Sequence, residues 1–96
     1  MQKSILIKEL WQAQKLSSRY EGGYSGEFLN AKEFSKALKE AIELFESGND
    51  CSLKDLMSWF APTTEWDDFI GEEGMKLGNS IFDKIGQYIE QNNIKI

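Results

Sequence analysis

The chain has 96 residues, 41% of them hydrophobic, a composition that suits one folded domain and excludes a disordered chain. Apolar runs reach only three residues, which argues against a membrane-spanning helix, and the N-terminus lacks the apolar core of a signal peptide. The single cysteine, Cys51, excludes an internal disulfide and suits a reducing compartment. We therefore expect one cytoplasmic domain over residues 1–96.

The formal net charge of −5 is concentrated in the middle of the chain. Residues 40–73 carry ten acidic side chains and one basic side chain, whereas residues 1–39 and 74–96 each carry a small positive balance. An acidic segment repels nucleic acid and anionic lipid and attracts basic proteins. We therefore expect a basic protein partner, and no binding to nucleic acid or to membranes. The simpler alternative is that the acidity only keeps the protein soluble.

The first predicted element is an amphipathic helix over about residues 4–18, whose apolar positions recur at three- and four-residue spacing. A glycine-rich loop follows, containing Tyr20, Glu21 and Tyr24. A phosphate-binding loop needs a strand before it and usually a nearby lysine or arginine. Here a helix precedes the loop, and the acidic residues Glu21 and Glu27 flank it. We expect a loop that is mobile or contacts a partner.

The second helix, over about residues 30–47, has the clearest boundaries. Asn30 is a favourable N-cap, and Glu33 stands at the third helical position, as in a capping box. The apolar residues between Glu33 and Gly48 recur at the helical period without exception. Gly48 is expected to end the helix in a left-handed conformation.

A third helix is predicted over about residues 52–61, with Ser52 as its N-cap. Its apolar residues cover most of its circumference, so it is either central to the core or leaves one apolar face for a partner. Pro62 ends this helix, because the residue before a proline is pushed out of the α region. The hydroxyl of Thr64 can then cap a short helical turn over residues 65–70.

The fourth helix is predicted over about residues 72–90. It contains Gly78 and Gly86, which lie on one face because they are eight residues apart. The missing side chains suggest close approach by a bulky group, for which Trp66 or Trp59 is the candidate. The chain as a whole is therefore expected to be all-α: a single-domain four-helix bundle with a short extra helical turn after the central proline.

The sequence offers little catalytic chemistry. It has no histidine, which removes the commonest general base, and Cys51 is next to Asp50, whose charge disfavours a thiolate. Asp68 and Glu72 are one turn apart on a continuous helix and suit a hard cation, but the spacing of a calcium-binding loop is absent. We expect no enzyme, no catalytic residue, no metal site and no cofactor. A carboxylate-based metal-binding protein or enzyme is the less favoured alternative.

Acidic residues flank large aromatic residues in the segment 65–73 and again near Tyr20. Aromatic side chains supply buried contact area in protein interfaces, and charges of one sign steer an oppositely charged partner. Trp66 and Phe69 are equally compatible with a place in the core. The candidate partner-binding residues are Glu65, Trp66, Asp67, Asp68, Glu72, Glu73, Tyr20, Glu21 and Tyr24.

In size, acidity and helical class the chain resembles the bacterial immunity proteins that neutralise secreted nuclease toxins, such as the colicin immunity proteins. This resemblance implies an immunity or antitoxin protein whose acidic residues cover a toxin's basic cleft or a nearby surface. It carries over no individual residue, because no motif is shared. The alternative is a regulatory or self-associating module, for example a homodimer formed through the helix over residues 52–61.

Overall fold

The computed structural model describes residues 3–20, 28, 30–61 and 64–94. Within these residues the chain forms helices and no β-strand. No helix among them is both long and apolar enough to span a bilayer. In chain order the α-helices, with two 3-10 helices η1 and η2, are α1 (Lys3–Ser17), α2 (Ala31–Glu46), η1 (Asp50–Ser52), α3 (Leu53–Phe60), α4 (Glu65–Phe69), η2 (Gly71–Gly74) and α5 (Met75–Gln91).

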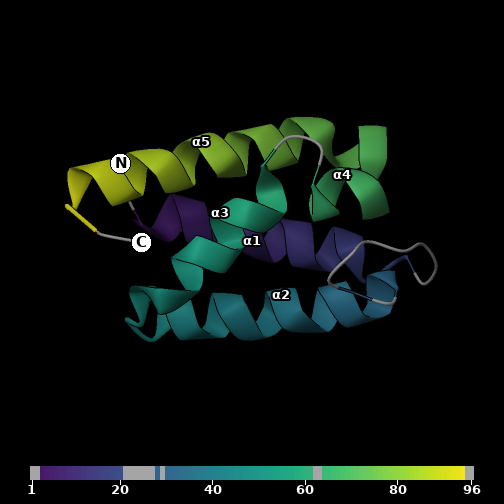
Figure 1. The fold of residues 1–96 in the computed structure, drawn as a ribbon, viewed down its shortest axis with the longest axis horizontal. Helices are drawn as coiled ribbons and strands as arrows, with labels where there is room; N and C mark the ends of the chain where they lie inside the picture. Colours follow the sequence, from purple (N-terminus) through teal and green to yellow (C-terminus); the bar gives the residue numbers. More distant parts are fainter. Residues whose placement is uncertain (1–2, 21–27, 29, 62–63, 95–96) are drawn as a thin grey trace.

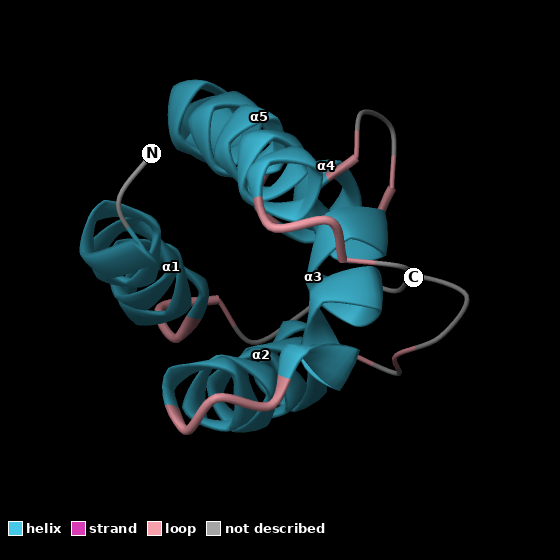
Figure 2. Ribbon diagram, turned by 90° about the vertical axis from the view of Figure 1, so that its left-hand side faces the viewer, coloured by secondary structure: helices cyan, strands magenta, loops and turns pink. Residues whose placement is uncertain are grey.

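The four longer helices surround one core. Each of them packs against two others, in the cyclic order α1, α2, α3, α5 (Figure 2). Helices α1, α2 and α5 follow the long axis of the molecule, and the shorter α3 lies between α2 and α5 (Figure 1). The five-residue α4 is the short extra turn after the proline. The prediction of an all-α single domain with four principal helices is confirmed.

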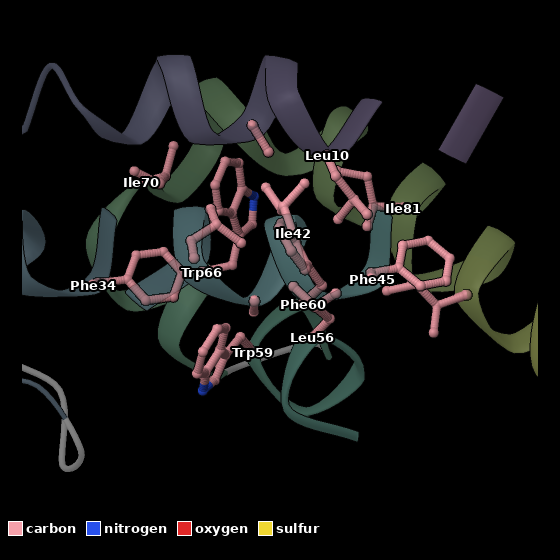
Figure 3. Packing of buried hydrophobic residues seen from close by; sticks show 14 of the residues in the cluster. Leu10, Phe34, Ile42, Phe45, Leu56, Trp59, Phe60, Trp66, Ile70 and Ile81 are labelled. Atoms are coloured by element: carbon pink, nitrogen blue, oxygen red, sulfur yellow. The ribbon is translucent and has the colours of Figure 1, made fainter. Parts of the chain in front are cut away.

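The core is built from the apolar positions that recur at helical spacing, with aromatic rings at its centre (Figure 3). Phe34 of α2 stacks on Phe69 of α4 with ring centroids 5.2 Å apart, and Phe60 of α3 lies 4.9 Å from the ring of Trp66. The side chains that are at least 98% buried and largest in volume are Trp66, Phe34, Phe45, Phe60, Leu6, Leu10, Leu38, Ile42, Leu53, Leu56, Ile81 and Ile85.

The boundaries of α2 are those that its sequence predicts. The Asn30 side-chain oxygen accepts a hydrogen bond from the Glu33 backbone N–H at 2.9 Å, which satisfies one of the free donors of the first turn. Gly48 has φ +97°, the left-handed conformation that glycine adopts without strain. Both the N-cap and the terminating glycine are therefore confirmed.

The start of α3 differs from the prediction. A 3-10 turn precedes the helix, and Asn49 rather than Ser52 caps it, accepting a hydrogen bond from the Cys51 backbone N–H at 3.0 Å. Ser52 already has helical dihedral angles (φ −72°, ψ −15°), whereas a capping serine needs an extended backbone. Its hydroxyl is buried and has no hydrogen-bond partner. The predicted Ser52 cap is wrong.

Thr64 precedes α4 but does not cap it through its side chain. Its hydroxyl instead lies 2.6 Å from the Ala61 carbonyl oxygen and 2.8 Å from that of Ser58. The hydroxyl therefore donates back to the end of α3, whose last carbonyls have no partner within the helix. This contact links the start of α4 to the end of α3.

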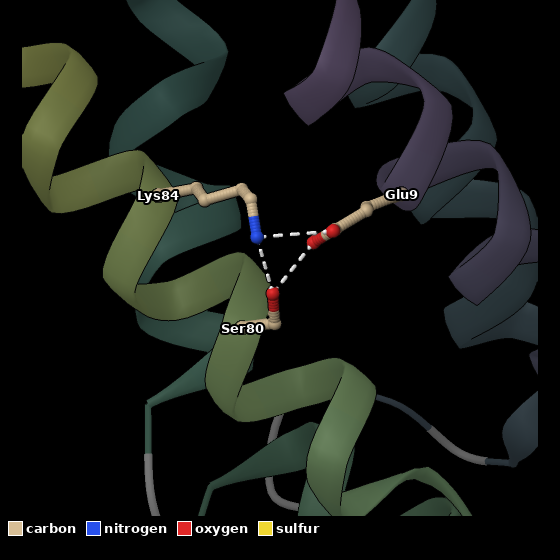
Figure 4. Close-up of polar contacts among 3 residues, drawn as sticks. All are labelled: Glu9, Ser80 and Lys84. Atoms are coloured by element: carbon tan, nitrogen blue, oxygen red, sulfur yellow. Dashed lines mark hydrogen bonds and ion pairs between the residues drawn. The ribbon is translucent and has the colours of Figure 1, made fainter. Parts of the chain in front are cut away.

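A polar contact joins the first and last helices on the surface of the bundle. The Lys84 ammonium group of α5 lies 3.0 Å from the Glu9 carboxylate of α1, and the Ser80 hydroxyl bridges the two side chains (Figure 4). Both charged side chains are partly exposed, so this network contributes little to stability compared with the core. It links α1 to α5 across the surface.

Candidate functional site

Trp66 is a core residue and not a surface contact, which corrects its assignment as a partner-binding residue. Its side chain is 1% exposed, and its indole N–H donates to the Gly74 carbonyl oxygen at 2.8 Å. Phe69 is also buried. The aromatic residues of this segment therefore anchor α4 to the core, and the alternative that placed both in the core is the correct one.

The ring of Trp66 packs against glycines of η2 and α5. A Cβ atom at Gly78 would lie 2.5 Å from Trp66 Cδ1, and one at Gly74 would lie 2.6 Å from Trp66 Cζ2. The predicted close approach of a tryptophan to Gly78 is confirmed. Gly86 has no atom within 4 Å of such a Cβ, so its predicted role in the same contact is wrong.

Because the apolar side chains of α4 turn inward, its acidic side chains turn outward. Asp68, Glu72 and Glu73 are exposed, and Glu65 and Asp67 are half-buried. We call these five residues of α4 and η2 the acidic surface. Their placement follows from local structure, since two short consecutive helices carry five carboxylates within nine residues. One oxygen of Glu65 is buried without a hydrogen-bond partner, so this residue is the least available to a partner.

Tyr20 joins the end of α1 to the acidic surface. Its hydroxyl donates a hydrogen bond to the Glu73 carboxylate, 53 positions further along the chain. The hydrogen bond to Glu73, followed by burial and by the negative charge of Glu73, raises the pKa of Tyr20, while the charge of Arg19 lowers it slightly. This contact places Tyr20 beside the acids of η2. Glu21 and Tyr24 lie outside the described residues.

Replacing Glu73 with glutamine is expected to lower the pKa of Tyr20 toward its ordinary value of 10.0, because the charged acceptor is removed. Tyr88 is the internal control: burial, then the charge of Asp50, raises its pKa, and neither changes in this variant. Because the pKa of Tyr20 is raised on folding, the stabilisation from its contact is present below pH 10 and is lost as the pH rises through the raised pKa.

The titration of the two tyrosines can be followed by NMR of ring-labelled tyrosine. A lower pKa for Tyr20 with an unchanged pKa for Tyr88 is the expected result. A pKa of Tyr20 that stays the same in the Glu73→Gln protein would contradict the contact.

The chemistry that the acidic surface offers is that of carboxylates. Carboxylates accept hydrogen bonds from cationic donors and attract positive charge over a distance of about 8–10 Å at physiological salt. Among the described residues, no group of three or more histidine, cysteine, aspartate or glutamate side chains is arranged to hold a metal ion.

A second feature, which was not predicted from the sequence, is a pocket of about 270 Å³ between α2 and α3. Its apolar wall is formed by Ala37, Ala41 and Leu44 of α2 and by Trp59 of α3. The α2 residues are spaced at i, i+4 and i+7, which places them on one face. The two small alanines in this row are a signal of a depression, but only the packing of α3 against α2 shows what lies opposite.

Comparisons of the chain with protein-family models, with curated proteins and with solved structures find no match.

Proposed function

We propose that this protein is a non-catalytic protein-binding domain, most specifically an immunity or antitoxin protein that neutralises a basic, nuclease-type bacterial toxin. The observation that carries this proposal is the acidic surface, in which Asp68, Glu72 and Glu73 are exposed while the aromatic residues beside them are buried. A toxin that cleaves nucleic acid needs a positively charged cleft, because phosphates give its substrate a high negative charge. An acidic surface carries the opposite charge and complements that cleft.

The proposed mechanism is electrostatic steering followed by steric blockage. Charges of opposite sign speed the encounter of two proteins, and the rate falls as salt screens them. Once bound, the helical domain covers the cleft or an adjacent surface and excludes the nucleic acid. With Trp66 in the core, the aromatic contribution to this contact falls to Tyr20, which is half-buried and bonded to Glu73. We place the protein in the cytoplasm, where its one cysteine stays reduced.

The second candidate, a regulatory or self-associating module, has less support. Helix α3 uses its large apolar residues in the core, since Leu53, Leu56, Trp59 and Phe60 are buried. The apolar face that a homodimer through this helix requires is thus taken up inside the bundle. A basic partner that is not a toxin would still fit the acidic surface, and identification of the partner decides between the two.

Capture of the partner from a lysate of the source organism, at low and at high salt, tests the proposal. The wild-type protein is compared with Asp68→Lys/Glu72→Lys, which reverses two exposed acids of the acidic surface. The matched control is Asp83→Lys/Glu90→Lys, which makes the same change in net charge at two exposed acids of α5. Circular dichroism confirms that all three proteins are folded.

We expect the wild-type and control proteins to retain one basic protein at low salt. The reversal at the acidic surface should weaken that binding by about tenfold or more, because attraction becomes repulsion, and high salt should weaken it as well. A toxin as the captured protein supports the immunity function. Equal capture by the two charge-reversed proteins, or no capture at either salt concentration, would contradict the proposal.

A further inference from the structure

The helix η2 carries Glu72 and Glu73, two of the carboxylates of the acidic surface, but its own backbone does little to keep them in place. It has four residues, begins and ends with a glycine, and has no capping hydrogen bond from a side chain. Short 3-10 helices have poorer hydrogen-bond geometry than α-helices, and glycine loses more conformational freedom on folding than any other residue. Contacts with other parts of the chain therefore decide how firmly η2 is held.

Two side-chain hydrogen bonds link η2 to other elements. The Trp66 indole N–H of α4 donates to the Gly74 carbonyl oxygen in the core. The Tyr20 hydroxyl, from just beyond the end of α1, donates to the Glu73 carboxylate at the surface. Tyr20 is half-buried and packs against the core, so the ring that carries the hydroxyl is itself supported. The first bond links the backbone of η2 to the core, and the second links one of its carboxylates to the end of α1.

The donor to Glu73 is uncharged, unlike the partner of another acid in the chain. Glu9 of α1 lies 3.0 Å from the Lys84 ammonium group, which compensates its charge (Figure 4). The Tyr20 hydroxyl adds no charge at neutral pH, because its ordinary pKa is 10.0 and the hydrogen bond to Glu73 raises that pKa. A carboxylate also has about four positions that accept hydrogen bonds, so one bond leaves the others for a second donor. Tyr20 thus contacts the carboxylate without cancelling its charge or using up its acceptor capacity.

We infer that Tyr20 is a positioning residue for binding of the basic partner, because it orders the Glu73 carboxylate before a cationic side chain of the partner arrives. Ordering an exposed, flexible side chain upon binding lowers the affinity, and a side chain that is already ordered in the free protein avoids this loss. The inference rests on the proposed function, since it takes the acidic surface as the place where a basic protein binds. It adds that Tyr20 strengthens the binding through Glu73 and without adding charge.

Side-chain NMR relaxation of the free protein tests the positioning without a partner. Deuterium relaxation of the Cγ methylene groups compares Glu73 with Glu72, the other exposed acid of η2. We expect Glu73 to be the more ordered of the two in the wild-type protein, and to become as mobile as Glu72 in Tyr20→Phe, which keeps the ring and removes only the hydroxyl. Tyr88→Phe is the matched control, because it removes a hydroxyl of α5 outside the acidic surface, and it should leave Glu73 unchanged.

Calorimetric titration with a hexa-arginine peptide that has blocked ends, at several salt concentrations, tests the effect on binding. Tyr20→Phe should weaken the affinity by about two- to fivefold, the range expected for ordering one exposed side chain. It should leave the salt dependence unchanged, because the number of charges is the same. Glu73→Gln should weaken both the affinity and its salt dependence, because a charge is lost. In the Glu73→Gln protein, Tyr20→Phe should have no further effect, since the two residues act as one unit.

A Glu73 side chain that is as mobile as Glu72 in the wild-type protein would overturn the inference. An equal loss of peptide affinity on Tyr20→Phe with and without the Glu73 carboxylate would also overturn it, because a merely structural role or a direct contact of Tyr20 gives that result. These outcomes are separate from failure of the proposed function. If Tyr20 orders Glu73 and strengthens peptide binding but no basic protein is captured from the lysate, the positioning of Glu73 for a cation stands and the immunity function falls. If a toxin is captured and Tyr20→Phe changes neither the order of Glu73 nor the affinity for the peptide, the reverse holds.

Discussion

Replacing Trp66 with alanine is expected to lower the free energy of unfolding by about 3–5 kcal/mol, the cost typical of removing a buried aromatic side chain. The ring is almost completely buried, lies against Phe60 and Phe34, and fills the space above Gly74 and Gly78. A domain of this size has a total stability of roughly 5–15 kcal/mol, so this one change removes a large part of it. Urea unfolding followed by far-ultraviolet circular dichroism measures the loss.

Trp66→Phe and Trp11→Phe form a matched pair that isolates the hydrogen bond of the indole. Trp66→Phe keeps a buried ring but leaves the Gly74 carbonyl oxygen without its partner, which should cost about 1–3 kcal/mol in addition to the lost volume. Trp11 is half-buried and donates to the exposed Glu46 carboxylate at 2.7 Å, where water can replace it. Trp11→Phe should therefore cost less than about 1 kcal/mol. Equal losses in the two phenylalanine variants would contradict the buried position of Trp66.

Gly78→Ala and Gly86→Ala are expected to change stability in opposite directions, although both replace a glycine within α5 by the same residue. At Gly78 the new Cβ would lie 2.5 Å from two atoms of the Trp66 ring, which is too close for any real contact. The ring is held by the core and by its bond to Gly74, so the overpacking should cost about 1–3 kcal/mol. At Gly86 no atom lies within 4 Å, and alanine should stabilise the helix by about 0.5–1 kcal/mol.

The same urea experiment measures both glycine variants, and the sign of the difference is the result that matters. A Gly78→Ala protein as stable as the wild type would mean that Trp66 does not pack on α5. A Gly86→Ala protein that loses stability would mean that some group approaches this glycine after all.

The helices could be predicted from the sequence because their signals are local. The apolar period of α2 and its N-cap at Asn30 involve residues a few positions apart, and the structure confirms both. The cap of α3 could not be predicted in the same way. Asn49 and Ser52 are both good capping residues, and the choice between them depends on where the backbone enters its first turn, which the packing of η1 against α2 fixes.

The glycines of α5 show the same limit at the level of packing. Their spacing indicated a face without side chains, and Trp66 does fill it at Gly78. The rest of the face stays open at Gly86, because one indole covers about one turn of helix and not two. The spacing of the glycines predicted that a bulky group packs closely against α5. It could not predict how far along the helix this contact extends.

The charge of the candidate site is a property of composition and could be predicted, whereas the exposure of each residue could not. Trp66 and Asp68 are two positions apart on one short helix, yet one is buried and the other is exposed. The bond between Tyr20 and Glu73 joins residues 53 positions apart, and the pocket at Asp55 needs α2 beside α3. These features come from the tertiary arrangement, which no local pattern contains.

The central claim, that the acidic surface is where a basic partner binds, is tested most directly by labelling the carboxylates themselves. Carbodiimide-driven amidation, read by mass spectrometry, reports how accessible each aspartate and glutamate is with and without the captured partner. We expect Asp68 and Glu72 to be labelled in the free protein and protected in the complex, while Asp83 and Glu90 of α5 stay equally labelled in both. Full labelling of Asp68 and Glu72 in a saturated complex would contradict the claim.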